Sequence, residues 1–130
     1  MSADSKAFLE QWHKIVATRD VEGLAAVLAE DVTLGAPPYW AKLETKEVVL
    51  RLLNIIINTI DDFIYHREWI NGSELALEFR GSVDGLGLQG IDLITLNDEG
   101  KLQNIDVMIR PMNTLAKLAG IVREKVMAAA

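Results

Sequence analysis

Two side chains in this sequence are candidates for a general acid or base at a functional site. Asp92 stands in the apolar stretch 91–96, which is typical of a strand. If Asp92 faces the interior, burial raises its pKa and makes it a hydrogen-bond donor or a base near neutral pH; an outward position leaves it a surface acid. His13 falls on an expected helix, where a lone histidine is more often structural than catalytic. Asp92 and His13 are therefore the catalytic candidates.

Large aromatic side chains supply candidates for a binding pocket. Tyr39 and Trp40 follow two prolines in an expected loop, where exposure to water is unfavourable, so we expect them to cover a cavity or a partner surface. For Trp12 and Trp69, core packing is an equally good explanation. Arg110 stands at the end of a strand, where it could close a pocket mouth or pair across a dimer. The candidate ligand-binding residues are Trp12, Tyr39, Trp40, Trp69, Ile105, Val107 and Arg110.

Glu78 and Arg80 share one face of an expected strand. They could form an ion pair inside the fold or lie on a solvated sheet surface. The surface position is favoured, because Leu75, Leu77 and Phe79 form the obvious core face of the same strand.

Composition excludes several classes of function. The chain has 130 residues, half of them hydrophobic, which fits one domain over residues 1–130 with a real core. Its 13 Lys plus Arg against 19 Asp plus Glu give a net charge of −6, which argues against a nucleic-acid partner. There is no cysteine, and the two histidines lack paired carboxylate spacing, so we expect no metal site and no cofactor.

No segment reads as a membrane or targeting element. The most apolar stretch, Leu52 to Ile60, is interrupted by two asparagines and is shorter than the roughly 20 residues that cross a bilayer. The amino terminus lacks a basic region followed by an apolar run. We therefore expect a cytoplasmic protein that does not enter the membrane.

Apolar residues at helical spacing predict three helices in the first half of the chain. The second is short, with an apolar stripe of Leu24, Val27 and Leu28, and the third opens at Thr45 with a wide stripe that ends at Ile60. The first helix is expected at 4–18, and a short strand at 32–34 precedes the third helix.

From Asp62 the period of the apolar pattern becomes two, which predicts an antiparallel meander. Strict alternation places Phe63, Tyr65, Arg67 and Trp69 on one strand face. Hairpin turns are expected at 71–72 and 97–100, with a bend or bulge among the glycines between 81 and 90. The expected strands are 62–70, 74–83, 88–96 and 102–110, and a closing helix follows Pro111.

Helices followed by hairpin-linked strands indicate an α+β fold. We expect a cone-shaped barrel: a strongly bent, mostly antiparallel sheet wrapped around the N-terminal helices, with a C-terminal helix. Several short motifs, in this order and spacing, resemble the nuclear transport factor two-like superfamily and, within it, the bacterial SnoaL-like proteins. They are Trp12, 19–24, 28–32, Pro37, 90–92, 98–102 and 109–111.

The resemblance implies a deep apolar pocket and frequent dimerisation through the outer sheet face. It does not imply one activity, because this superfamily includes isomerases, cyclases, hydrolases and proteins without known catalysis. Isomerases of the fold keep a Tyr and an acid where this chain has Trp12 and Ala36, and only their third acid is matched, by Asp92. The general base of that mechanism is therefore absent.

Two functions remain open at this point. The first is binding of a small apolar molecule, with or without isomerase-, cyclase- or hydrolase-like acid/base chemistry by Asp92, assisted by His13, Tyr39 or Arg110. The alternative is a non-catalytic dimeric binding or interaction module, which a filled core beside Trp12 and Asp92 would favour. In either case we expect a homodimer through the strand faces that carry Met108.

Overall fold

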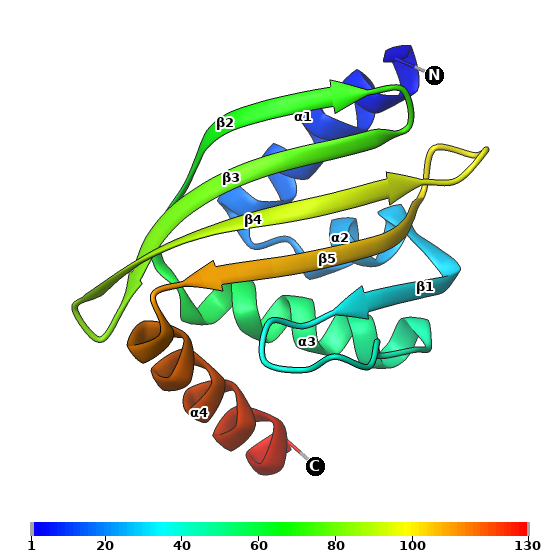
Figure 1. Cartoon of the computed structure of the whole chain (residues 1–130). Coiled ribbons are helices and arrows are strands. Elements are labelled where there is room, and N and C mark those ends of the chain that lie inside the picture. The colour runs from blue at the N-terminus through cyan, green and yellow to red at the C-terminus, as the bar shows by residue number, and fades with distance from the viewer. Residues whose placement is uncertain (1, 130) are drawn as a thin grey trace.

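A curved sheet covered on one face by helices is the frame of the molecule. The computed structural model describes residues 2–129. Its elements are α1 (Ser2–Thr18), α2 (Val21–Val27), β1 (Leu28–Gly35), α3 (Lys46–Thr59), β2 (Asp61–Asn71), β3 (Glu74–Val83), β4 (Leu86–Leu96), β5 (Leu102–Arg110) and α4 (Met112–Ala129). Figure 1 shows α1, α2 and α3 behind the sheet, and α4 leading away from the end of β5.

The sheet is mixed and open. Its strand order is β1-β5-β4-β3-β2, with β1 parallel to β5 and every other neighbour antiparallel. The predicted α+β class, with a strongly bent and mostly antiparallel sheet, is confirmed. The cone is not a closed barrel, because the edge strands β1 and β2 do not pair with each other.

Helix ends are fixed by side chains that satisfy free backbone N–H groups. Asp20 caps α2 by accepting a hydrogen bond from the Gly23 N–H at 3.0 Å. Thr45 caps α3 by accepting one from the Val48 N–H at 3.3 Å, at the residue where the third helix was expected to open. Val49, Leu53 and Ile57, spaced four residues apart, are the buried face of α3, and they fix this helix against the sheet.

Several boundaries differ from the sequence expectation, and two of the differences have a structural reason. Leu28 begins β1 rather than closing the second helix, because it pairs with Leu102 in a parallel ladder that the local sequence does not reveal. The glycine-rich segment between β3 and β4 contains no bulge. Asp84 and Gly85 both have positive φ, 50° and 80°, and form a two-residue turn that keeps both strands in register.

An extra residue in β2 reverses the faces of this strand. Tyr65 pairs with Phe79 and Arg67 pairs with Glu78, so the register shifts between them and a β-bulge results. Tyr65 therefore faces the core with Phe79, whereas Arg67 and Trp69 face outward. The expectation that Phe63, Tyr65, Arg67 and Trp69 share one face is wrong, because a bulge moves every following side chain to the opposite face.

The packing around Gly90 on β4 leaves no room for a side chain. Gly90 pairs with Phe79, whose ring occupies the space above it, and a methyl group at Gly90 would collide with this ring and lie 2.7 Å from the Met108 carbonyl oxygen. Gly87 on the same strand has open space around it, with no atom within 4 Å of the position that a Cβ would take.

We expect Gly90→Ala to lower the free energy of unfolding by about 1–3 kcal/mol, because the Phe79 ring must shift within a packed core. Gly87→Ala is the matched control and should change stability by less than about 0.5 kcal/mol. Chemical denaturation of both variants measures the difference. Equal stability of the two variants would contradict this account of Gly90.

Candidate functional site

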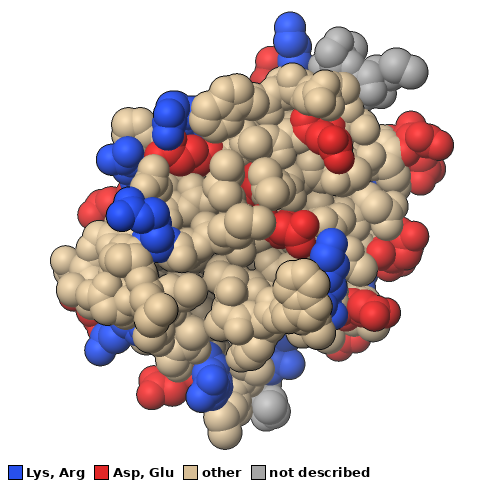
Figure 2. All heavy atoms as spheres, in the orientation of Figure 1, with Lys and Arg blue, Asp and Glu red and all other residues tan. Residues whose placement is uncertain are grey.

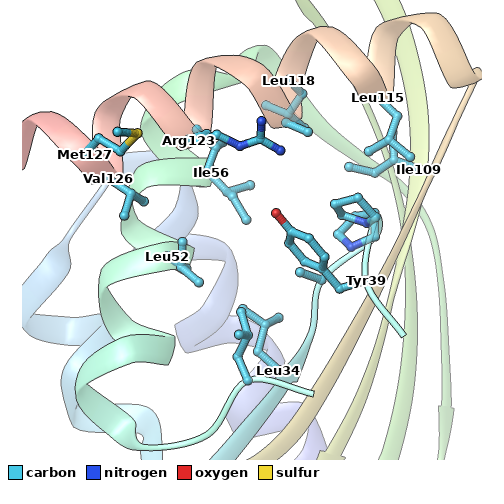
Figure 3. A pocket seen from close by; sticks show the side chains of 16 residues that line it. Leu34, Tyr39, Leu52, Ile56, Ile109, Leu115, Leu118, Arg123, Val126 and Met127 are labelled. Carbon is cyan, nitrogen blue, oxygen red and sulfur yellow. The ribbon is translucent and has the colours of Figure 1, made fainter. Parts of the chain in front are cut away.

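A cavity of about 330 Å³ lies between α3, α4 and the end of β1 with its following loop. This volume is at the lower end of the range for small-molecule sites. Figure 3 shows the walls converging on an empty space between the two helices. Most of the lining is aliphatic, including Leu34, Leu52, Ile56, Ile109, Leu118 and Val122.

Only a few polar groups reach this cavity. The Tyr39 hydroxyl comes from the loop after β1 and the Arg123 guanidinium from α4, and Figure 3 shows both pointing into the space. Ala36 lines it as well. Among the lining residues that the structure describes there is no Asp, Glu or His, so the cavity offers hydrogen-bond donors and a positive charge but no carboxylate or imidazole base.

Backbone and side-chain contacts hold the loop wall in place. Leu34 and Leu43 exchange two backbone hydrogen bonds, of 3.0 and 2.8 Å, which close the loop that carries Tyr39. Two prolines at its start fix the backbone at φ near −65°. The loop therefore presents the Tyr39 ring on a short, closed frame.

Contacts near both ends of α4 hold the helical wall. The Thr114 hydroxyl donates to the Gly87 carbonyl at 3.0 Å, and Arg51 of α3 donates to the Val126 carbonyl at 3.0 Å. Leu118, between these contacts, is buried. The cavity is thus the space left between α3 and α4 where their side chains do not fill the gap.

The buried acid lies elsewhere, between the sheet and α1. Asp92 is 5% exposed and faces the core. The Tyr65 hydroxyl donates to its Oδ2 at 2.8 Å, and the Trp12 indole N–H donates to the Tyr65 oxygen at 2.8 Å. Burial raises the pKa of Asp92 to about 7, against the opposing effect of the Tyr65 hydrogen bond. Burial, and then the Asp92 charge, also raise the pKa of Tyr65.

His13 approaches this buried chain of hydrogen bonds from the surface. Its Nε2 pairs with the Glu68 carboxylate, and its ring meets the edge of Tyr65 at a centroid distance of 5.3 Å. The structure therefore brings His13 near Asp92 through Tyr65. Neither His13 nor Asp92 lines the cavity between α3 and α4.

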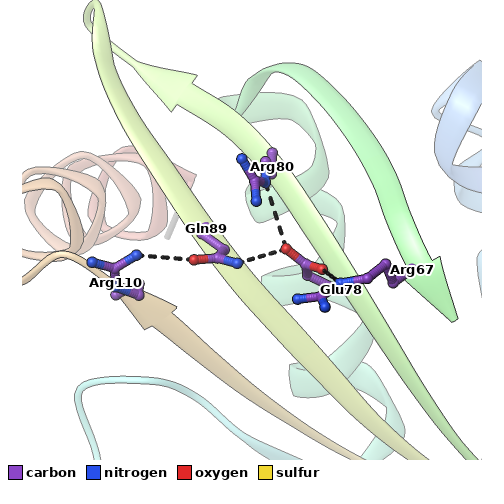
Figure 4. Close-up of polar contacts among 5 residues, drawn as sticks. All are labelled: Arg67, Glu78, Arg80, Gln89 and Arg110. Carbon is purple, nitrogen blue, oxygen red and sulfur yellow. Dashed lines mark hydrogen bonds and ion pairs between the residues drawn. The ribbon is translucent and has the colours of Figure 1, made fainter. Parts of the chain in front are cut away.

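The outer face of the sheet carries a second polar network, shown in Figure 4. Glu78 accepts hydrogen bonds from Arg67 and from the Gln89 amide, which lies 2.6 Å away, and Arg80 lies 3.5 Å from it. Arg110 extends the network by donating to Gln89 at 3.0 Å. The hydrogen bond from Arg67, then the one from Gln89, lower the pKa of Glu78 to about 2. Glu78 lies on the outer face of the sheet, as the sequence favoured. Its carboxylate is nevertheless buried, because these neighbouring side chains cover it.

The remaining predicted ligand-binding residues are dispersed. Of that set, Tyr39 lines the cavity, whereas Trp12, Ile105 and Val107 are buried in the core and Trp40 is 99% exposed. Trp69 is half exposed on the outer face of the sheet, and Arg110 lies on the same face as part of the Glu78 network. Sequence reasoning missed the α4 wall, above all Arg123. The local signals were the wide stripe of the third helix and the apolar stripe of the closing helix, which consists of Leu115, Leu118, Ala119, Val122 and Val126.

Among residues 2–129, no three His, Cys, Asp or Glu side chains gather in a way that could hold a metal ion. No helix in the same range is both long enough and apolar enough to span a bilayer.

Solved structures resemble this chain along nearly its whole length. A steroid delta-isomerase from Pseudomonas aeruginosa is 32% identical with a TM-score of 0.93, over 98% of this chain and 94% of that one. An uncharacterised protein with a cystatin-like fold from Silicibacter pomeroyi DSS-3 is 32% identical with a TM-score of 0.88, over 92% and 85%. An NTF2-like (nuclear transport factor two-like) protein of unknown function from Mesorhizobium loti shares the fold at 16% identity and a TM-score of 0.76, over 85% and 93%.

The chain belongs to the NTF2-like superfamily. This confirms the resemblance drawn from the motifs between Trp12 and Pro111. No protein-family model matches this NTF2-like chain, and no curated protein matches it. Its neighbours establish the fold and include proteins named as isomerases, so the assignment of an activity depends on the site itself.

We expect Asp92→Asn to alter how stability depends on pH. In the unfolded chain Asp92 loses its proton near pH 4, whereas the folded protein keeps it until about pH 7. Its stabilising contribution is therefore complete below pH 4 and is lost as the pH rises through 7. The Asn side chain can still accept from Tyr65 but does not titrate.

Between pH 4 and pH 8 the Asn variant should gain about 2–4 kcal/mol relative to the wild type. Urea denaturation at both pH values measures this change. Asp98→Asn, in an exposed turn, is the control and should follow the wild-type profile. Parallel profiles for wild type and Asp92→Asn would show that Asp92 ionises normally in the folded protein.

Proposed function

We propose that this NTF2-like protein binds a small, largely apolar molecule in the cavity between α3, α4 and the β1–α3 loop. The observation that carries the proposal is the cavity itself, about 330 Å³ with an aliphatic lining and two polar groups. Burial of apolar ligand surface against such a lining contributes roughly 25 cal/mol per Å². The loop and helix contacts that fix the two walls support a site that exists before the ligand arrives.

The lining favours binding over the chemistry of the isomerase that this chain resembles. Ala36 and Trp12 stand where the resemblance implies a base and a phenol, and Ala36 lines the cavity without a proton acceptor. Asp92, the remaining acid of that pattern, faces the core behind Tyr65. Acid/base catalysis by Asp92 would require the substrate to displace this packing, so we propose a binding protein.

We also propose that two copies associate through the outer sheet face. Exposed apolar side chains occur on β2, β4 and β5, and Figure 2 shows that uncharged side chains cover much of this face. Apolar surface of this extent is typical of an interface, and a two-fold axis would pair the face with itself. The side chains are Ile64, Trp69, Leu93 and Met108.

The binding proposal is tested with 1-decanol, an apolar probe with one hydroxyl. We expect saturable binding at one site per chain by titration calorimetry, and a rise in Tm. Ala119→Phe, which fills part of the cavity, should weaken binding at least about tenfold, equivalent to about 1.4 kcal/mol. Ala7→Phe, on the exposed side of α1, is the matched control and should bind as the wild type does. Equal weakening by both variants, or no binding to the wild type, would refute the proposal.

The dimer proposal is tested by analytical ultracentrifugation at micromolar concentration. The wild type should sediment as a dimer, and Met108→Lys should shift it toward monomer, because the interface would bury unpaired charges. Met112→Lys is the control at an 84% exposed methionine of α4 and should leave the dimer intact. A wild-type monomer under these conditions would be evidence against the interface.

A further inference from the structure

The basic side chains around the cavity differ in whether they have a hydrogen-bond or ion-pair partner in the protein. Arg123 is the one on its lining, and no hydrogen bond or ion pair joins its guanidinium to another side chain or carbonyl among residues 2–129. Its neighbours are engaged. Arg51 donates to the Val126 carbonyl at 3.0 Å, Lys125 donates to the Thr59 hydroxyl at 2.7 Å, and Lys117 lies 3.4 Å from the Asp84 carboxylate.

The Arg123 guanidinium and the Tyr39 hydroxyl face each other across the cavity. Figure 3 shows the two groups pointing toward one another, with the side chain of Ile56 beside the space between them. They come from different elements, α4 and the β1–α3 loop. Both are hydrogen-bond donors, so a single acceptor group placed between them would bind both at once.

We propose that the occupant of the cavity is an amphipathic carboxylic acid. This deepens the proposed function and rests on it. The carboxylate would accept hydrogen bonds from Arg123, whose planar guanidinium matches its two oxygens, and from Tyr39. The apolar body would lie against the aliphatic side chains of α3 and α4. One guanidinium balances one negative charge, and the lining residues supply no second cation.

The cavity also limits the size of the acid. At the packing density of protein interiors, about 0.75, the cavity accommodates on the order of ten to twenty non-hydrogen atoms. A medium-length alkyl acid or a small fused-ring acid fits this range. Decanoate is therefore a suitable probe, with 1-decanol and decylammonium as partners of the same chain length.

The test compares these three probes by titration calorimetry at pH 7.5, with decanoate and decylammonium below their critical micelle concentrations and 1-decanol below its solubility limit. The wild type should bind decanoate about fivefold more tightly than 1-decanol, and decylammonium more weakly than either. Arg123→Gln should abolish the preference for decanoate while changing 1-decanol affinity less than about twofold. Arg19→Gln, at an exposed arginine outside the lining, removes the same charge and should keep the preference.

A double-mutant cycle tests whether both donors bind the same group. Tyr39→Phe should reduce decanoate affinity by about threefold, and its effect should largely disappear when Arg123 is already Gln. Equal affinity of wild type for decanoate and 1-decanol, or a decanoate preference that survives Arg123→Gln, would overturn the inference and leave the binding proposal intact. Absence of binding by all three probes would overturn both.

Discussion

The bulge in β2 is the constraint on which both polar networks of the sheet depend. With one extra residue between Tyr65 and Arg67, the first side chain points into the core and the second points outward. Tyr65 can then donate to Asp92, and Arg67 can donate to Glu78 on the opposite face. A regular strand would place both side chains on one face and leave one of the two carboxylates without its partner. Because the cost of an unsatisfied buried acid is large, the irregular strand is the more stable solution.

Apolar packing and ligand space are divided between two regions of the molecule. The space between the sheet and α1 is filled, with Trp12 and Phe79 almost fully buried, and Asp92 is satisfied within it. The open space lies where α4 crosses α3, beyond the part of the sheet that covers α1. Ala36, which the resemblance places where isomerases of this superfamily keep their base, lines this open space. The chain therefore retains a cavity beside that position and lacks the acid.

The sequence was sufficient for elements that depend on local rules and insufficient for those that depend on distant partners. Helical stripes and the opening of the third helix at Thr45 were predicted, as was an inward Asp92 as one of two options. A hairpin turn was predicted at 71–72 and lies one residue further on, at 72–73. The bulge at β2 was not predicted, because no glycine or proline marks it and its reason lies in Glu78 and Asp92 on other strands. An apolar cavity was predicted, but its position between α3 and α4 was not. Its walls are held together by contacts such as that of Arg51 with Val126, which are 75 residues apart in the sequence. Arg123 looked like any surface arginine of an amphipathic helix.

The position of α4 has a consequence for how the cavity exchanges its contents. Figure 1 shows this helix outside the sheet, and its polar contacts with other elements are three hydrogen bonds and one ion pair, made by Thr114, Lys117, Lys125 and the Val126 carbonyl. Rotation or local undocking of α4 would open the cavity without breaking any strand pairing, and such local openings need less free energy than global unfolding. A molecule in the cavity would then complete the apolar contact between α3 and α4. The bound molecule would then contribute to holding α4 against α3, so the fraction of protein molecules with α4 docked would rise with the concentration of that molecule.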